Sequence, residues 1–422
     1  MTQGGGLLQL VAIGPQDVYL TGNPQTTFFK AVYRRHTQFS VESNRMYFDG
    51  TPDFGQKISC LVPRLGDLLG NLFLVVTLPA LTLPNGTPVG YTNAIGHALI
   101  EEISVQIGSQ EIDKQTGEWM HLWSKLSVEA SKKTGFQQLI GEIDGFPSVT
   151  QMGPVTLHIP LQFWFCNNPG LYLPLIALQY HPVRINISLA PLQKLFYTNN
   201  LVTSEDPCSI IVNKASITNV ELWGDYVYLD VQERRRFTSS PLEYLIHQVQ
   251  YTPHFPVPPT ANSGTFQLDF NHPCKEFFWV LQRNKMLDTH EYFNYSSLAS
   301  NEVGPGPYDL ITNALIQLDG QDRFEKRGPV YFRTIQPYQR HTSIPSGQYI
   351  YCYSFALRPE DIQPTGTLNC SRIEKVVLQI TPNNTVAELP SGGRGAMSCH
   401  VYALNYNVLR VIGGMAGLRF PA

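Results

Sequence analysis

The feature of this sequence that most constrains its fold is a strict alternation of apolar and other residues in short runs. Every odd position from Val155 to Phe165 is apolar, while Trp164 shares the even positions with Thr, His, Pro and Gln. Segments 183–189 and 266–270 repeat this period of two. Successive side chains of a β-strand point to opposite faces, so the pattern predicts half-buried strands of antiparallel sheets.

Turn residues and further apolar runs extend this prediction to the whole chain. The 33 Gly and 31 Pro residues are scattered between short segments, as in an all-β protein with many turns. The apolar segment 68–84 is interrupted by Asn71 and Pro79 and is slightly too short to span a membrane, so it is expected to be a buried strand and a loop. Helices are expected in two places only, from Asn23-Pro24 through Val32 and over about 118–132.

The length of 422 residues exceeds what one hydrophobic core normally supports, which favours two domains. A faint repeat relates 103–114 to 314–326, each with strand, Gly-containing turn and polar return. Seven or eight strands per half fit a jelly roll. The predicted fold is therefore all-β, with two consecutive eight-stranded antiparallel jelly-roll barrels and few short helices in loops. The expected boundaries are an N-terminal arm at 1–25, a first barrel at 26–225, a linker at 226–241 and a second barrel at 242–422.

Charge and cysteine content exclude several classes of function. Charged residues make up only 15% of the chain, which suggests that surface is hidden against neighbours, and the net charge of −3 gives no attraction to nucleic acid. The seven Cys residues are odd in number and widely spaced, so neither a disulfide scaffold nor a CxxC zinc site is expected. No Lys or Arg precedes Lys30, so a signal peptide is not expected either.

Motifs that carry chemistry are missing from the sequence. The eleven His residues form no HxH or HExxH pattern, and GxSxG and Walker A motifs do not occur. We therefore expect no catalytic, cofactor-binding or metal-binding residues, no enzyme activity, and no metal or cofactor that copurifies, although a composite metal site from distant residues remains open. Glycosylation sequons at Asn85, Asn294 and Asn383 are candidate modification sites.

The N-terminal segment is expected to act in assembly. Three of its first six residues are Gly, which suits a flexible tether, and an apolar group follows that needs a surface to cover. The candidate assembly residues are Leu7, Leu8, Leu10, Val11 and Ile13. The alternative is that this segment is the first strand of the first barrel.

Stretches along nearly the whole chain resemble the major capsid proteins of nucleocytoplasmic large DNA viruses, most closely those of algal viruses. These stretches are 5–35, 54–59, 169–181, 228–234, 243–246, 270–273, 317–323, 353–357 and 405–410. The resemblance implies a double jelly roll that forms homotrimeric, pseudo-hexagonal capsomers. Such capsomers tile an icosahedral shell around an internal membrane and a double-stranded DNA genome. It also implies neighbouring capsomers and minor capsid proteins as partners, a location in the virion, and assembly in the host cytoplasm.

Two other classes of function remain open on the residues alone. Jelly rolls often bind sugars through aromatic loops, and aromatic residues are 11% of this chain, so a carbohydrate-binding, lectin-like protein is the first alternative. An enzyme built on a β-sandwich is the second, and it would need a convergent titratable cluster.

Overall fold

The computed structural model describes residues 4–82, 89–143, 151–198, 215–299, 307–345, 347–383 and 395–421. The chain divides into two compact units, Met1–Gln38 and Phe39–Ala422, and each is described by itself.

The first unit contains two short helices, α1 (Gly5–Val11) and α2 (Val18–Thr21), and neither has a buried residue. The helix predicted from Asn23-Pro24 through Val32 is wrong. Asn23 has a positive φ of 50°, and the chain after it is not helical. Isolated short helices are marginal in water, and Phe28 and Phe29 are almost fully exposed, so no packing stabilises a helix here.

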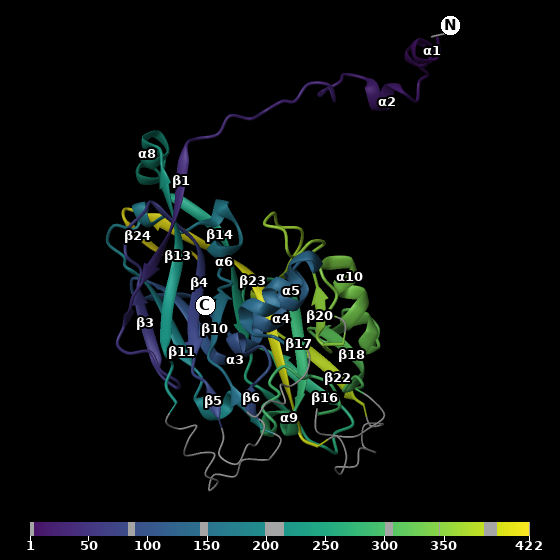
Figure 1. Cartoon of the computed structure of the whole chain (residues 1–422). Helices are drawn as coiled ribbons and strands as arrows, with labels where there is room; N and C mark the ends of the chain where they lie inside the picture. The colour runs from purple at the N-terminus through teal and green to yellow at the C-terminus, as the bar shows by residue number, and fades with distance from the viewer. Residues whose placement is uncertain are drawn as a thin grey trace. The chain divides into compact units, whose positions relative to one another are not determined.

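The first barrel is made by two main sheets of the second unit (Figure 1). One has the order β1 (Phe39–Met46), β13 (Asn219–Leu229), β4 (Leu68–Leu78), β10 (Val155–Pro160). The other has the order β2 (Phe48–Asp49), β3 (Lys57–Leu61), β11 (Val183–Leu189), β7 (Ile100–Ile107), β8 (Gln110–Thr116). Two small pairs are β12 (Phe196–Thr198) with β6 (Val89–Tyr91), and β5 (Leu81–Thr82) with β9 (Gln151–Met152).

The period of two predicted these strands well, with one exception. Alternate residues of β11 are buried, as expected for 183–189, and the segment from Leu68 forms the buried strand β4. The alternation from Val155, however, ends at Pro160, and α6 (Trp164–Asn167) replaces the last part of the expected strand. Trp164 is buried rather than on an open face, because the helical turn directs it into the core.

The second barrel repeats this arrangement. Its larger sheet has the main order β14 (Leu242–Tyr251), β23 (Met397–Ile412), β17 (Pro273–Arg283), β20 (Tyr351–Ser354). Three short strands extend it, namely β15 (Phe255–Val257) and β24 (Met415–Leu418) on β23, and β21 (Leu368–Asn369) on β17. The smaller sheet has the order β16 (Gly264–Leu268), β22 (Val376–Pro382), β18 (Ile311–Leu318), β19 (Gln321–Asp322).

The two barrels have matching strand orders. β1, β13, β4 and β10 correspond in sequence order and pairing to β14, β23, β17 and β20, while β3, β11, β7 and β8 correspond to β16, β22, β18 and β19. The faint repeat at 103–114 and 314–326 falls on the equivalent hairpins β7–β8 and β18–β19. Both turns use glycine with positive φ, at Gly108 and Gly320, where a side chain would be strained. The predicted double jelly roll is confirmed.

Helices connect the strands and cover their ends. Those of the second unit are α3 (Ile95–Leu99), α4 (Gly117–Ser127), α5 (Lys133–Ile140), α6, α8 (Val231–Ser239), α9 (Asn284–Asp288) and α10 (Gln336–Arg340). Shorter turns are η2 (Ala130–Lys132), η3 (Pro169–Leu171), η4 (Leu175–Ala177), η5 (Leu192–Lys194), the π-helix η6 (Tyr331–Ile335) and η7 (Cys370–Arg372).

Two of these helices bear on the sequence predictions. The helix expected over 118–132 is present as α4, whose N-cap Thr116 accepts a hydrogen bond from the backbone of Trp119. It ends at Ser127, earlier than expected, and the short turn η2 and the separate helix α5 follow it. The segment 226–241 contains the end of β13 and then α8. Each helix in the described part of the chain is too short or too polar to span a bilayer.

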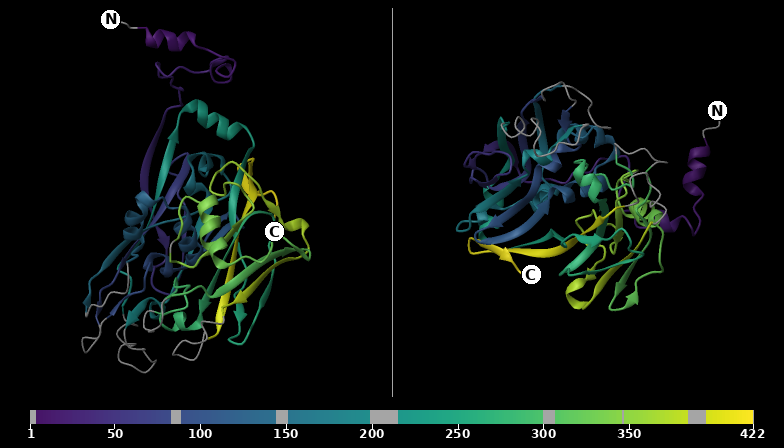
Figure 2. Two further views of the ribbon diagram at one scale, coloured as in Figure 1. Left: turned by 90° about the vertical axis from the view of Figure 1, so that its right-hand side faces the viewer. Right: turned by 90° about the horizontal axis from the view of Figure 1, so that it is seen from below.

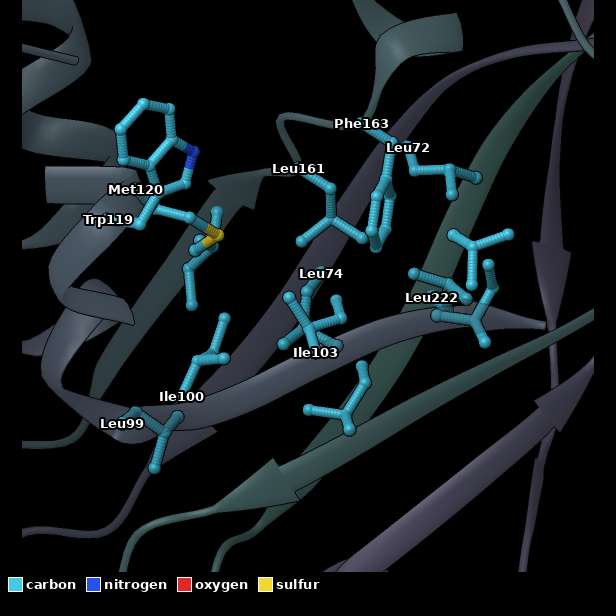
Figure 3. Close-up of a cluster of buried hydrophobic side chains, with 14 of the residues drawn as sticks. Leu72, Leu74, Leu99, Ile100, Ile103, Trp119, Met120, Leu161, Phe163 and Leu222 are labelled. Carbon is cyan, nitrogen blue, oxygen red and sulfur yellow. The ribbon is translucent and has the colours of Figure 1, made fainter. Parts of the chain in front are cut away.

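The core of the first barrel lies between its two sheets. Leu72 and Leu74 of β4 and Ile103 of β7 belong to this cluster, and Trp119 and Met120 of α4 lie at one end of it (Figure 3). All five side chains are at most 2% exposed. Helix α4 thereby packs on the first barrel, and Trp119 extends the same cluster to residues of the second.

Candidate functional site at the seam between the barrels

The larger sheet of the second barrel is buried on both faces. Phe277 and Trp279 of β17 pack in the core of the second barrel, whereas Phe278 and Val280 belong to the cluster of the first. Strand β23 divides in the same way, with alternate residues assigned to the two clusters. One face of this sheet therefore lines its own barrel, and the other forms a seam with the first barrel. The two barrels lie side by side in both views of Figure 2.

Aromatic rings of α4 and of the larger sheet occupy the centre of the seam. The ring of Trp119 lies edge-on to Phe278, with centroids 5.1 Å apart, and 5.8 Å from Tyr402. On its other side it stacks on Trp123 at 5.7 Å. Edge-to-face and offset-stacked pairs at such distances add to the stabilisation from buried area. Helix α4 therefore supplies an aromatic contact of the first barrel with the second, beside the contact of β8 with β14.

Hydrogen bonds join the barrels around this aromatic centre. Asp113 of β8 accepts from the backbone N–H of Val249 in β14 at 3.1 Å, and burial raises the pKa of Asp113 to about 6. The hydroxyl of Thr92 donates to the carbonyl of His290 at 2.5 Å. Backbone contacts add to these, from Tyr180 to Gly414 and from Ser343 to Leu126, both 2.9 Å. The seam is thus fixed by directional bonds as well as by apolar packing.

Glu118 is an acidic group of the seam with three partners from the second barrel. Its carboxylate accepts from the hydroxyls of Tyr402 at 2.6 Å and Tyr295 at 3.0 Å, and His400 Nδ1 lies 2.8 Å from Oε2. Burial alone would raise the pKa of Glu118, but the charge and hydrogen bond of His400, with the two hydroxyls, bring it below its usual value. Because these partners all come from the second barrel, Glu118 ties α4 to that barrel.

Two groups of side chains among the described residues have the composition and spacing of metal ligands. The first is Glu118, His254 and His400, beside a cavity of about 360 Å³ in the seam. Its two imidazole rings stack with centroids 3.6 Å apart and planes only 14° apart. The lone pairs of ring nitrogens lie in the ring planes, so parallel stacked rings do not direct them at one point. This group is better explained as a hydrogen-bonded junction than as a metal site.

The second group is Glu276, His341 and Cys352, on the seam face of the larger sheet. His341 Nε2 lies 2.7 Å from Glu276 Oε1, and its Nδ1 lies 2.9 Å from Glu360 Oε1. Burial would lower the pKa of His341, but the two carboxylates and Cys352 bring it well above its usual value. The imidazole thus bridges two carboxylates in an interior position.

Of the glycosylation candidates predicted from the sequence, Asn294 lies at this seam, where it lines a cavity with Thr92 and His121 of the first barrel. Asn294 donates its side-chain amide to Glu291 at 2.6 Å and to the carbonyl of Leu298, and Asn383 donates to the carbonyl of Asp309 at 3.0 Å. Asn85 lies outside the described residues. Glycosylation at these three residues stays a prediction that peptide mass spectrometry tests.

The five apolar arm residues lie in or beside α1 and are exposed. Their exposed fractions run from 63% to 80%, and they are Leu7, Leu8, Leu10, Val11 and Ile13. Their role in assembly stays a prediction.

Sequence reasoning missed the seam because its members are far apart in the chain. Glu118 and His400 are 282 positions apart, and no local motif joins them. One pattern could have pointed to it. In β23 the residues His400, Tyr402 and Leu404 lie on one face of the strand, and Val401 and Ala403 lie on the other. Both sets are large or apolar, which is typical of a strand buried on two faces.

Comparison with known protein families agrees with this architecture. A sequence model described as major capsid protein N-terminus matches residues 27–230, and one described as large eukaryotic DNA virus major capsid protein matches residues 233–417. The major capsid protein of Pyramimonas orientalis virus is 40% identical over 447 residues, and that of Paramecium bursaria Chlorella virus 1 is 35% identical over 457. Each alignment covers 99% of both chains.

Solved structures give the same result. VP54 of PBCV-1 superimposes with a TM-score of 0.78 and 30% sequence identity, covering 94% of this chain and all of that one. The Faustovirus major capsid protein has a TM-score of 0.74 at only 12% identity, with 95% and 94% of the two chains covered, and so shares the fold.

Proposed function

This chain belongs to the family of large eukaryotic DNA virus major capsid proteins, and on that premise we propose that three copies of it form one pseudo-hexagonal capsomer. The chain is a structural subunit of a viral capsid, built as a double jelly roll. Because each copy carries two barrels of matching strand order, three copies around an axis present six similar barrels. That internal repetition is the observation that carries the proposal.

The seam supports this role because a capsomer needs a rigid building block. The apolar cluster of the first barrel continues through Phe278, Val280 and Tyr402 into the second, so the barrels share one packed interior. Close-packed protein interiors resist deformation. In a subunit of this kind the two barrels move as one block, without a hinge between them. Its contacts with one neighbour therefore fix its position relative to the next.

The capsomers then tile an icosahedral shell around an internal membrane and a double-stranded DNA genome, beside neighbouring capsomers and minor capsid proteins. Within the virion this chain is located in the capsid shell, and the shell is assembled in the host cytoplasm. The net charge of −3 supports a shell that does not bind the genome directly. In this role the chain has no catalytic activity, and its buried side chains serve to pack the two barrels and the seam between them.

Mass measurement of the purified chain tests the trimer. Light scattering should give three times the 47.4 kDa of one chain, and negative-stain microscopy should show hexagonal particles with a threefold axis. A stable monomer at micromolar concentration would contradict the capsomer. If that monomer also bound glycans, the lectin-like alternative would take its place.

The domain boundary has its own test. We assign residues 26–225 and 242–422 to the two barrels and 226–241 to the linker between them. Either barrel expressed alone would expose the apolar seam around Trp119 or Phe278, so each should be poorly soluble without the other. Two separately soluble, monomeric barrels would show that the seam is a weak contact.

The arm, residues 1–25, serves assembly in this proposal. Exposed apolar side chains of α1 require a surface to cover, and a surface on its own or a neighbouring capsomer supplies one. Deleting residues 2–13 should leave the thermal transition within a few degrees of wild type but impair assembly into shells. Replacing Leu7, Leu10 and Ile13 by Ser is the matched control, and it should impair assembly without shortening the chain. Loss of folding on deletion would instead identify the segment as part of a barrel.

A further inference from the structure

Three metal-ligating side chains come together on the seam face of the larger sheet of the second barrel. In the β17–β20 pair, Glu276 lies opposite Ser354 and Phe278 opposite Cys352. Glu276 and Cys352 are therefore diagonal neighbours on one face of two paired strands. His341 follows directly after α10 and reaches the same point. One ligand atom from each of the three lies within 4.8 Å of the other two.

We propose that Glu276, His341 and Cys352 form a structural zinc site. Sulfur, imidazole nitrogen and carboxylate oxygen are the three ligand types that Zn²⁺ takes in proteins, whereas Ca²⁺ and Mg²⁺ prefer oxygen alone. The side chains of His341 and Glu276 are fully buried, and Cys352 is 1% exposed, so no competing solvent reaches the ligand atoms. This proposal replaces the expectation from the sequence that no metal copurifies.

An unpartnered oxygen supplies the fourth ligand. Oε2 of Glu276 is buried with no hydrogen-bond partner among the described residues, although its sister atom Oε1 is bound to His341. A buried acceptor without a partner is costly, and a bidentate carboxylate on zinc removes that cost. One thiolate and one carboxylate also neutralise the two positive charges of the ion, which a buried site requires.

Glu360 holds the ring of His341 in the way that a carboxylate usually holds a metal-binding histidine. When one nitrogen of a histidine binds a metal, the other normally donates to a carboxylate or carbonyl, which fixes the ring. Here Glu360 lies 2.9 Å from His341 Nδ1, and its carboxylate also accepts from the backbone of Thr342 at 3.0 Å. Nε2 is then directed at Glu276 and Cys352. Zinc ligands lie roughly 3.3 to 3.6 Å apart, so Nε2 and Oε1, now at 2.7 Å, would separate by roughly 0.6 Å.

Such an ion would strengthen the seam. The segment after His341 contacts the first barrel, because Ser343 donates to the carbonyl of Leu126 and the His341 ring lies 6.1 Å from Trp123. The ion would therefore join β17, β20 and a segment held against α4. The site goes beyond capsomer formation and does not depend on it.

Elemental analysis of full-length protein tests the site. Protein expressed with added zinc sulfate, so that the ion can enter during folding, and purified without a metal-affinity step should carry about one zinc per chain. Cys352→Ser should lose the zinc, whereas Cys166→Ser, a cysteine of the first barrel outside the group, should keep it. Glu360→Gln should weaken zinc affinity by about 10- to 100-fold without abolishing it.

The result that overturns the proposal is a wild-type protein with no more zinc than Cys352→Ser, since the group would then be a buried ion pair only. If Cys352→Ser does not fold, cobalt replaces the variant as the test. Wild-type protein loaded with Co²⁺ should show a thiolate-to-cobalt charge-transfer absorption, and absence of that band would equally overturn the proposal. Trimer formation can succeed or fail independently of either result.

Discussion

The equivalent central strands of the two barrels, β4 and β17, bury different chemistry. Both have eleven residues and the same place in the strand order. The buried positions of β4 are almost entirely aliphatic, with the other face half-buried. Strand β17 is buried along nearly its whole length and includes Lys275, Glu276, Gln282 and Arg283.

Position in the molecule explains this difference. β4 has the core on one face only, whereas β17 lies between its own core and the seam, so its polar residues have no route to water. They are therefore bound to protein groups. Lys275, at a β-bulge, donates to the carbonyl of Pro359 at 2.6 Å and lies over the ring of Tyr406, and burial lowers its pKa to about 7. A duplicated barrel can thus keep its topology while one copy takes on polar groups at an internal interface.

The largest effect is expected where the two barrels meet. Trp119→Ala removes the ring that contacts both Phe278 and Tyr402, so it should lower the free energy of unfolding by about 3–5 kcal/mol. Chemical denaturation, monitored by circular dichroism, measures this loss in the free energy of unfolding. Trp223→Ala is the control, because that ring is only half-buried on β13, and it should cost clearly less. Equal losses would mean that the seam adds no stability of its own.

The next prediction compares the two central strands directly. Leu74→Ala in β4 should cost about 2–5 kcal/mol, because it leaves a cavity in a fully buried position. Lys275→Met in β17 should change stability by no more than about 1 kcal/mol, or raise it, because removing a buried ammonium offsets the lost hydrogen bond to Pro359. The denaturation midpoints of the two variants show which substitution lowers the stability more. A loss at Lys275 as large as that at Leu74 would show that the buried lysine is a net source of stability.

A smaller, pH-dependent effect is expected from a histidine of the first barrel. His97 is fully buried, neither ring nitrogen has a hydrogen-bond partner among the described residues, and burial followed by the charge of Lys125 lowers its pKa to about 3. His121 faces it as well, at 5.7 Å. The unfolded chain binds a proton below about pH 6.5 and the folded chain does not, so stability falls by about 2 kcal/mol from this residue between pH 7 and pH 5.

Replacing His97 by Phe removes that titration while keeping a ring of similar size. The variant should lose about 2 kcal/mol less than wild type between pH 7 and pH 5, with His121 accounting for part of what remains. Urea denaturation at several pH values gives the difference. Identical pH profiles would indicate that His97 is protonated in the folded chain.

The smallest effect is expected at the outer edge of the first barrel. Arg45 of β1 pairs with Glu221 of β13 at 2.6 Å, and the Arg45 side chain is 41% exposed. Exposed ion pairs contribute little, because solvent screens them and both side chains lose freedom, so Arg45→Ala should cost less than about 1 kcal/mol. Thermal unfolding measures it. A larger loss would mean that β1 depends on this contact for its pairing with β13.

The strands and the duplication could be predicted because both depend on local pattern. A period of two places alternate side chains on opposite faces whatever the rest of the chain does, and the predictions for 183–189 and for β4 are confirmed. The helix from Asn23 and the end of the strand at Phe165 were wrong. In both places the outcome depends on what a segment packs against, since a short helix without packing is unstable and Trp164 finds a core position after the strand has ended.

By itself, then, the sequence determined the all-β class and the period of the strands, because these follow from side-chain alternation and turn residues over short stretches. It also determined the two halves, because these follow from the chain length and the internal repeat. The tertiary structure alone decided which face of β17 and β23 meets the first barrel, and so which distant residues become neighbours. Glu118 reaches His400 across 282 positions, and Glu276 reaches Cys352 through strand register. The physical reason is that register and sheet packing are set by the burial of the whole apolar surface at once, which no local spacing records.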